Sequence, residues 1–596
     1  MQYFIIFTVI FTFAVMLTIV FKKRIEQVLP IGIVTIILII YIAGMFDNLK
    51  IGVIITQIFT LLQLATILII IKKKGKNEIK QILERILTPG LLVYVLLFVG
   101  SIIINKNRIF EDYDEFSHWG VIIKNMFNYN TFGTNEESIV RFNEYPPFTA
   151  IFQYLFLGIQ KIYREDTIII AQNILYFSII IPITKTIKWD KSMKKLLAII
   201  PILIFLPMIF YENFFLDILV DGLLGTMFAY TMFCAFEKEE NIIFKYTKIL
   251  AGLIMLCLTK TTGITLAIVA ILIIFIKKLL EIKNKNEKLI KEMIAIIIIV
   301  VITTMLTSIW YSKTKNEEKR WDFKQIVQTE ENRSSEQMQI TKSFKNALIY
   351  RKNITSKELT TWTCILLLIS LQIYTISKVK DKDYNYYSKA TLITIPIYLI
   401  GLWITYITIF DITEAVQVTC FDRYTSTILL ANAIFSILAL ADVEEWNSKK
   451  IFITISILLS LIPLTTIETK YIDGKNYVTM SNINRDIFTK INKYKDKLQT
   501  EDKILYIVGS KGKGELLTKM NEYVIMPIRI EETIKGDFDT LEQLEKMAKD
   551  YTHIFIYRMD KEDKENVKAI FENKTVKNDT LYKVEYENEK IILKVQ

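Results

Sequence analysis

Stretches of about 15–22 mostly apolar residues recur along this chain from Tyr3 to Ile467, and no other feature constrains its fold as strongly. Each stretch is long enough to cross a hydrocarbon core of about 30 Å as a helix. The sequence therefore predicts a polytopic α-helical membrane protein with about fourteen transmembrane helices. We place them at roughly residues 3–21, 28–46, 51–71, 86–104, 166–184, 196–210, 216–236, 246–258, 263–276, 292–311, 361–377, 390–407, 425–443 and 451–467.

The composition argues against several other classes of protein. Hydrophobic residues make up 52% of the chain, more than a soluble domain with one apolar core needs. The formal charge is +11, but the cations form short clusters between apolar stretches rather than a stripe that could follow phosphates, so we expect no nucleic-acid partner. The cysteines lie in or beside apolar stretches without metal-ligand spacing, so neither a zinc site nor a disulfide framework is indicated.

Basic residues indicate the orientation of the chain. No basic residue precedes the first stretch and Lys22-Lys23-Arg24 follows it, opposite to a cleavable signal peptide, so we expect an anchor that starts outside. The short loops that this arrangement places outside contain only Lys50, Lys260 and Arg423, whereas the loops placed in the cytoplasm are rich in Lys and Arg. We therefore predict a multi-pass protein of the cytoplasmic membrane with both termini outside.

One further apolar segment, residues 148–160, does not fit this alternation as a span. Counting it would move the basic cluster at 185–195 to the outside, so we interpret it as an interfacial or re-entrant helix on the outer side. A short true span is the alternative.

The remaining segments suggest two domains. Residues 1–467 would form the membrane domain, with large external loops at about 105–165 and 312–360. The tail, 468–596, reads as a small extracytoplasmic α/β domain, with strands at 503–508 and 552–557, helices at 541–549 and 561–571, and a hairpin at 580–595.

The densest polar segment is Phe110–Gly120, directly after the fourth predicted span. It contains the acids Glu111, Asp112, Asp114 and Glu115 and the histidine His118. Acids crowded beside a membrane repel one another unless cations, a metal or a substrate offset their charge, although a solvated loop is the alternative. The apolar residues that follow predict an amphipathic helix on the bilayer surface. A carboxylate at that depth could deprotonate an acceptor hydroxyl.

Other polar residues stand at the outer ends of later spans. Tyr145-Pro146-Pro147 precedes the 148–160 segment and suits the first turn of a helix. Asp217 and Asp221 are four residues apart, so on a helix they would share a face, and acids within an apolar stretch favour a functional role.

Two rare external cations complete the set. Lys260 lies between two predicted spans, and Arg423 is followed by Tyr424 before the thirteenth span. These cations could bind a phosphate and the tyrosine ring could contact a sugar or prenyl group. Alternatively, either cation could pair with Asp411 or Glu414. Together, acids and cations on one side of a membrane suit displacement of a lipid phosphate from a sugar, because a base serves the acceptor and cations stabilise the departing phosphate.

In their order along the chain, these segments resemble the GT-C superfamily of membrane glycosyltransferases, whose members include protein O-mannosyltransferases and the aminoarabinose transferases of lipid A. The resemblance covers roughly residues 86–445. It implies transfer of a sugar, usually with inversion, from a polyprenyl-phosphate donor to a hydroxyl acceptor on the outer face. The acceptor could be a cell-envelope polymer, a lipid or a protein. The chain departs from the family in its three extra leading spans and in Glu144, where some relatives have a basic residue.

The resemblance also implies roles for the acids. By position, Asp114 would activate the acceptor hydroxyl, with Glu115 as its partner. Asp221, or less well Asp217, matches the second acid of the family. Some relatives need a divalent cation such as Mg or Mn, which Asp112, Asp114 and Glu115 could hold through their oxygens.

The resemblance assigns the donor phosphate to Lys260 and Arg423, supported by Tyr424 and His118. Two other functions share much of this pattern. A lipid-linked polysaccharide polymerase or ligase would use the same side and similar cations with a larger donor. A flippase or transporter of glycolipids would instead place charged groups near the bilayer midplane, which the sequence disfavours.

Overall fold

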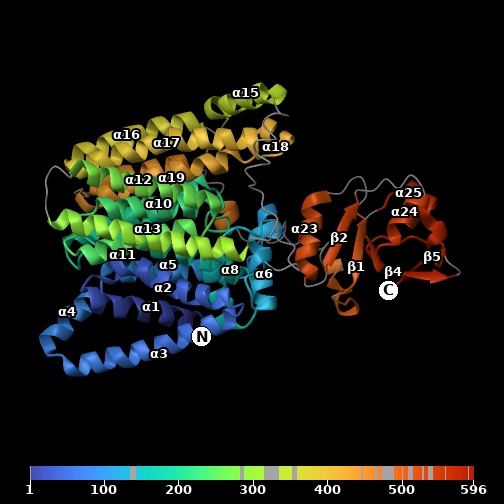
Figure 1. Ribbon diagram of the computed structural model, residues 1–596, viewed down its shortest axis with the longest axis horizontal. Coiled ribbons are helices and arrows are strands. Elements are labelled where there is room, and N and C mark those ends of the chain that lie inside the picture. Colours follow the sequence, from blue (N-terminus) through green and yellow to red (C-terminus); the bar gives the residue numbers. More distant parts are fainter. Residues whose placement is uncertain are drawn as a thin grey trace. The chain divides into compact units, whose positions relative to one another are not determined.

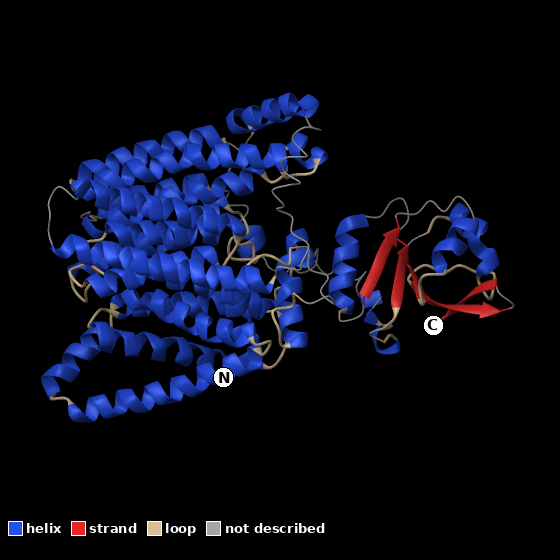
Figure 2. Ribbon diagram, in the orientation of Figure 1, coloured by secondary structure: helices blue, strands red, loops and turns tan. Residues whose placement is uncertain are grey.

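The computed structural model describes residues 2–134, 142–281, 287–314, 334–351, 359–443, 447–462, 467–472, 489–490, 492–499, 501–507, 514–526, 529–534, 541–557, 559–587 and 590–596. The chain forms two compact units. The helical unit contains Met1–Asn107, Asn130–Thr134 and Phe142–Glu468, and the tail unit contains Arg108–Tyr129 and Thr469–Gln596. Helices alone build the helical unit, whereas all strands belong to the tail unit, as far as the described residues go (Figure 2).

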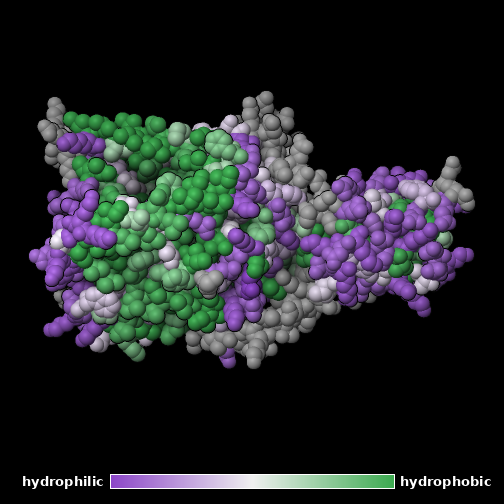
Figure 3. All heavy atoms as spheres, turned by 90° about the horizontal axis from the view of Figure 1, so that it is seen from below, coloured by the Kyte–Doolittle hydropathy of each residue, from purple (hydrophilic) through white to green (hydrophobic). Residues whose placement is uncertain are grey.

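The helical unit is a bundle of long apolar helices that run side by side (Figure 1). Ten of the described helices are long and apolar enough to cross a membrane, or eleven if the bent pair α4–α5 counts as one span. They identify a multi-pass membrane protein, and a broad part of the unit's surface is hydrophobic (Figure 3). The ten are α1 (Gln2–Phe21), α2 (Ile25–Met45), α3 (Leu49–Lys73), α8 (Glu165–Ile180), α9 (Leu196–Phe210), α12 (Thr261–Glu281), α13 (Glu287–Lys313), α16 (Thr361–Val379), α17 (Lys382–Thr408) and α19 (Phe421–Val443), with α8 and α9 lengthened by short 3₁₀ turns.

By length and composition, the described residues thus contain ten or eleven candidate spans, fewer than the predicted fourteen. Three of the predicted spans are short helices: α10 (Asp221–Phe236) and α11 (Ile242–Cys257) have 16 residues each, and α20 (Ser448–Leu461) has 14. At 1.5 Å per residue each is shorter than a hydrocarbon core of about 30 Å. A fourth, at 86–104, corresponds to α5 (Pro89–Asn105), which has 17 residues and meets the preceding helix α4 (Lys76–Ile86) at 45°.

The segment 148–160 forms the short helix α7 (Phe148–Gln160). Every residue of α7 except Gly158 is buried, and α7 packs against α8, α1, α2 and α3. A helix lying at an interface would expose one face, so the interfacial interpretation does not fit, whereas a short helix inserted among the others does. Most of the predicted loop 312–360 lies outside the described residues, apart from α15 (Ser334–Tyr350).

Ion pairs between helices support the predicted alternation of loops. Lys23 pairs with Glu239, Lys238 with Asp381, and Lys277 with Asp383, all between loops predicted on one side. Lys313 pairs with Asp47 at 2.7 Å, between two loops predicted on the other side. These pairs place loops of the same predicted side at the same end of the bundle. The end that faces outward stays a prediction from the charge count.

Close packing of α10 on α19 positions the start of both helices. A Cβ atom at Gly225 would lie 2.4 Å from the carbonyl oxygen of Thr427, so only glycine permits this approach. Asp221 lies one helical turn before Gly225, and Arg423 lies one turn before Thr427. The packing therefore brings Asp221 and Arg423 to the same place.

The tail unit contains a five-stranded sheet with the order β2-β1-β3-β4-β5. The strands β1 (Lys503–Ile507), β2 (Arg529–Ile534) and β3 (His553–Ile556) are parallel, and β4 (Thr580–Glu587) and β5 (Lys590–Val595) form the antiparallel hairpin that the sequence predicts. Along β1, Leu505 and Ile507 pack in a core with α24 (Leu541–Ala548) and α25 (Lys561–Val567). Ile504 and Tyr506 pack on the other face with α23 (Gly514–Ile525), which the sequence analysis missed together with β2.

The acidic segment 108–129 belongs to the tail unit, not to the membrane domain as predicted. It forms a π-helical turn, η1 (Glu115–Trp119), followed by α6 (Gly120–Tyr129). The ring of Phe116 lies 5.3 Å from the ring of Tyr523 in α23, and the Lys124 ammonium donates to the carbonyl of Val524 at 3.3 Å. Val121 and Ile123 of α6 are buried, unlike the apolar face of a helix lying on a bilayer.

Candidate functional site

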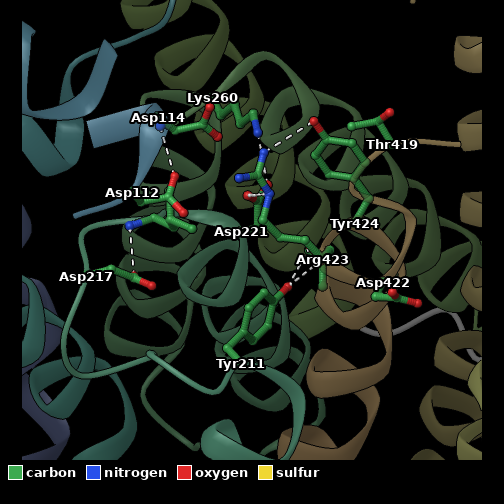
Figure 4. A network of polar contacts seen from close by, with 12 residues as sticks. Asp112, Asp114, Tyr211, Asp217, Asp221, Lys260, Thr419, Asp422, Arg423 and Tyr424 are labelled. Carbon is green, nitrogen blue, oxygen red and sulfur yellow. Dashed lines mark hydrogen bonds and ion pairs between the residues drawn. The ribbon is translucent and has the colours of Figure 1, made fainter. Parts of the chain in front are cut away.

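Three charged side chains of the helical unit meet where three helices begin (Figure 4). Asp221 is the first residue of α10, Lys260 immediately precedes α12, and Arg423 lies in the first turn of α19. The Asp221 carboxylate lies 2.9 Å from the Lys260 ammonium through one oxygen and 3.3 Å from Arg423 Nε through the other. The structure thus joins three residues that the sequence analysis selected separately; we call them the outer cluster, after the side that the charge count predicts for them.

The outer cluster is buried, and its lysine stays charged. The exposed fractions of the side chains are 5% for Asp221, 10% for Lys260 and 16% for Arg423. Burial lowers the pKa of Lys260, but the nearby Asp221 carboxylate more than offsets this effect, so the pKa lies above its ordinary value and the ammonium stays charged at neutral pH. The two ion pairs thus bring two cations to one carboxylate, and cations of this kind can bind an anionic ligand.

Aromatic rings enclose the cations. The Lys260 nitrogen lies 5.5 Å from the Tyr424 ring centroid and 5.8 Å from that of Tyr145, within the range of cation–π attraction. Tyr145 belongs to the Tyr-Pro-Pro segment, which is fixed because Phe148 donates its N–H to the Leu258 carbonyl at 2.6 Å. The Tyr211 hydroxyl donates to the Arg423 carbonyl at 2.8 Å and so anchors the start of α19.

A cavity of about 230 Å³ extends from the outer cluster between α12 and α17. Asp221, Lys260 and three tyrosines line its polar end, and mostly apolar residues line the remainder. The full lining consists of Tyr145, Asp221, Lys260, Thr262, Thr265, Leu266, Val269, Thr394, Ile397, Tyr398, Gly401, Leu402, Thr405, Ile409, Phe410 and Tyr424. Ile397 is 50% exposed and a Cβ atom at Gly401 would meet no atom within 4 Å, so the cavity reaches the apolar surface of the unit.

The sequence analysis did not predict that α17 lines a cavity, although the sequence contains a pattern that indicates it. Thr394, Tyr398, Gly401 and Thr405 all line the cavity. Their spacing of four, three and four residues places them on one face of a helix. Polar or small residues at helical spacing within an apolar span therefore mark the helix face that lines the cavity.

Asp217 does not share a helix face with Asp221, contrary to the prediction. Residues 211–220 form turns rather than a helix, and the Asp217 carboxylate accepts the N–H of Leu219 at 3.1 Å. This short-range bond is typical of an aspartate that stabilises a turn. Asp221 alone supplies the carboxylate of the outer cluster.

The acids of the first loop lie in the tail unit and have local structural contacts. Glu115 is buried, and one carboxylate oxygen accepts the N–H groups of Glu111 at 2.6 Å and Asp112 at 2.8 Å. Asp112 accepts the N–H of Asp114 at 2.9 Å. Glu115 and Asp112 therefore stabilise the turn through backbone N–H groups, and Asp112 and Asp114 are both half-buried. The His118 ring is buried and lies 4.4 Å from the ring of Trp119.

The predicted divalent cation does not fit these acids. Among the residues that the structure describes, no group of three or more His, Cys, Asp or Glu side chains is arranged to hold a metal ion. The physical reason is visible at Glu115, whose carboxylate oxygen binds backbone N–H groups instead of turning toward Asp112 and Asp114 as a shared ligand set would require.

Comparison with other proteins gives no match: no family model, no curated protein and no solved structure is similar to this chain.

Proposed function

We propose that this protein is a glycosyltransferase that moves a sugar from a polyprenyl-phosphate donor to a hydroxyl acceptor at the outer face of the membrane. One observation carries the proposal: a single cavity has a cationic end at Lys260 and an apolar length between two membrane-spanning helices. A polyprenyl phosphate has the same division, with an anionic head and a long apolar chain. The aromatic side chains at the cationic end suit the sugar, which is attached to the phosphate.

The cations of the outer cluster suit the phosphate of the donor. A polyprenyl-phosphate sugar is a phosphodiester with one negative charge, which Lys260 and Arg423 could contact. When the sugar departs, negative charge builds on the phosphate oxygen that it leaves. Lys260 and Arg423 are held in place by Asp221 before the reaction, so they can stabilise this charge without reorganising.

The apolar part of the cavity suits the isoprenoid chain. Leu266 and Val269 of α12 face Ile397 and Leu402 of α17 across it. The exposed Gly401 and the half-exposed Ile397 let a lipid enter sideways from the hydrocarbon core. A donor could therefore bind without leaving the bilayer, with its phosphate at the level where α10, α12 and α19 begin.

Asp114 is the proposed base. Its carboxylate would take the proton of the acceptor hydroxyl while that oxygen attacks the anomeric carbon. The bond from the anomeric carbon to the phosphate oxygen breaks, and the electron pair leaves with the polyprenyl phosphate. Attack opposite the leaving group inverts the anomeric centre. The segment that contains Asp114 continues directly from Asn107 of the helical unit.

The experiment is the release of polyprenyl phosphate from a panel of polyprenyl-phosphate monosaccharides, with a cell-envelope extract as acceptor. We expect one donor to be consumed by the wild-type protein, and we expect Asp114→Asn to abolish release. Asp47→Asn is the matched control, because Asp47 is an exposed carboxylate that pairs with Lys313. Absence of release with every donor, in protein shown to be folded, contradicts the proposal and favours a polymerase, ligase or transporter.

A further inference from the structure

Arg423 reaches the outer cluster from a strained turn. The residues before α19 include two non-glycine residues with left-handed backbone, Val418 with φ of 45° and Cys420 with φ of 58°. A β-branched residue such as valine adopts this conformation rarely and at a cost in free energy. Such a turn persists only when its surroundings hold it, so its contacts decide where the start of α19 lies.

Two side chains from other helices hold the carbonyl groups of this turn. The Tyr406 hydroxyl of α17 donates to the Thr419 carbonyl at 2.5 Å. Arg351, which follows α15, donates from Nη1 to the Val418 carbonyl at 2.8 Å. Its Nε lies 3.5 Å from the carboxylate of Asp422, the residue before Arg423. Arg351 therefore contacts both the strained turn, at Val418, and the first turn of α19, at Asp422.

The helix α15 places Arg351. Ile340, Phe344 and Ala347 of α15 pack in one apolar cluster with Val418 and Phe421 of the turn. The Phe344 and Phe421 rings meet edge to face at 5.2 Å. The N–H of Arg351 still bonds to the Ala347 carbonyl at 3.2 Å, so Arg351 moves with α15. The same apolar cluster contains Leu402 and Phe410, which also line the cavity.

We propose that Arg351 is a positioning residue: by holding the strained turn Val418–Cys420, it aims Arg423 at Asp221 and at the ligand phosphate. The role of Arg423 toward phosphate rests on the proposed function, whereas the grip of Arg351 on the turn does not. Docking of α15 then controls whether the outer cluster has both of its cations in place.

Cys420 lies inside the strained turn and reports on it directly. Its thiol is half-buried, whereas Cys234, Cys257 and Cys364 are buried. We expect Arg351→Met to raise the rate of maleimide labelling at Cys420 by about tenfold, because the released turn opens. Arg351→Lys keeps a cationic donor, so we expect its rate of labelling at Cys420 to lie between those of the wild type and Arg351→Met. Lys345→Met removes a charge from the exposed side of α15 and should label as the wild type does.

A binding cycle then tests the link from Arg351 to Arg423, with farnesyl phosphate as the probe. Arg351→Met and Arg423→Met should each weaken binding by about tenfold, and the double variant should bind no more weakly than Arg423→Met alone. An unchanged labelling rate in folded Arg351→Met, or effects that multiply in the double variant, would overturn the inference. If Arg423→Met leaves affinity unchanged, the phosphate site of the proposed function fails, and the labelling still decides whether Arg351 holds the turn.

Discussion

Two buried ion clusters lie at opposite ends of the helical unit, and they differ in charge balance. The outer cluster joins one carboxylate, Asp221, to Lys260 and Arg423. The inner cluster lies at the other end of α10, where Glu237 pairs with both Lys185 and Lys248 and where Lys185 also lies 2.8 Å from Asp442. The inner cluster therefore has two carboxylates for two ammonium groups.

The difference separates a structural cluster from a ligand site. Buried charges that neutralise one another join helices and leave nothing for a ligand to compensate. The outer cluster, in contrast, borders a cavity that could admit a ligand. None of the four inner residues is among those that line this cavity. Access to a cavity, more than burial, thus distinguishes the two ends.

The largest effect is expected from breaking the inner cluster. Lys248→Met leaves Glu237 and Asp442 sharing Lys185, so the cluster gains an uncompensated buried carboxylate. We expect the free energy of unfolding, measured in mixed micelles, to fall by about 3–5 kcal/mol. Turnover by the fraction that stays folded should be near that of the wild type. A loss of turnover without a loss of stability would mean that the inner cluster is not structural.

The equivalent change in the outer cluster should lower activity strongly and stability only slightly. Lys260→Met leaves Asp221 paired with Arg423. We therefore expect the free energy of unfolding to change by only about 1 kcal/mol. The removed cation should lower kcat/KM for polyprenyl-phosphate release by about 100- to 1000-fold, as loss of one transition-state donor does. Full activity in this variant would show that the charge of Lys260 has no role in the reaction.

Acid should weaken the inner cluster specifically. Burial raises the pKa of Glu237, but Lys185 and Lys248 more than offset this and lower it from 4.5 to about 2. A lowered pKa stabilises the fold above the ordinary pKa, and this contribution of roughly 3 kcal/mol is lost as the pH falls from about 4.5 to about 2. We expect the unfolding temperature to drop across this range, and to drop less in Glu237→Gln. If the unfolding temperature of the wild type and of Glu237→Gln depended on pH in the same way, a lowered pKa of Glu237 would be contradicted.

The smallest effect tests the lipid path rather than the charges. Gly401→Leu would add a side chain at the cavity wall whose Cβ atom meets no atom within 4 Å, and leucine favours a helix more than glycine does. We expect KM for a long-chain donor to rise about tenfold, with a smaller rise for a farnesyl donor. Gly100→Leu is the control, because Gly100 also faces open space but does not line the cavity. Equal effects of the two changes would argue against this path.

The sequence predicted the candidate site best through the charged residues that stand at the ends of apolar stretches. Asp221, Lys260 and Arg423 stand out as charged residues at the ends of apolar stretches, and the structure joins them. Hydropathy could not tell where a helix begins within such a stretch, so the predicted span 216–236 includes residues 216–220, which lie before α10 begins. Local patterns reveal the chemistry of a segment but not the exact length of its helix.

Contacts between distant segments lay beyond sequence reasoning. The pairing of α12 with α17 that forms the cavity depends on packing across residues 261–408. The contact of segment 108–129 with α23 joins residues about 400 positions apart, as Lys124 and Val524 show. Arg351 carried no signal at all, because its importance comes from the backbone strain at Val418 that it opposes.

The most direct test of the central claim is photoaffinity labelling with a prenyl phosphate that carries a diazirine on its chain, followed by mapping of the labelled peptides. The account predicts labels on α12 and α17, at or near Leu266 and Ile397, and loss of labelling in Lys260→Met but not in Lys248→Met. Labelling that is confined to other helices, or that is unaffected by Lys260→Met, would contradict the assignment of this cavity to the donor lipid.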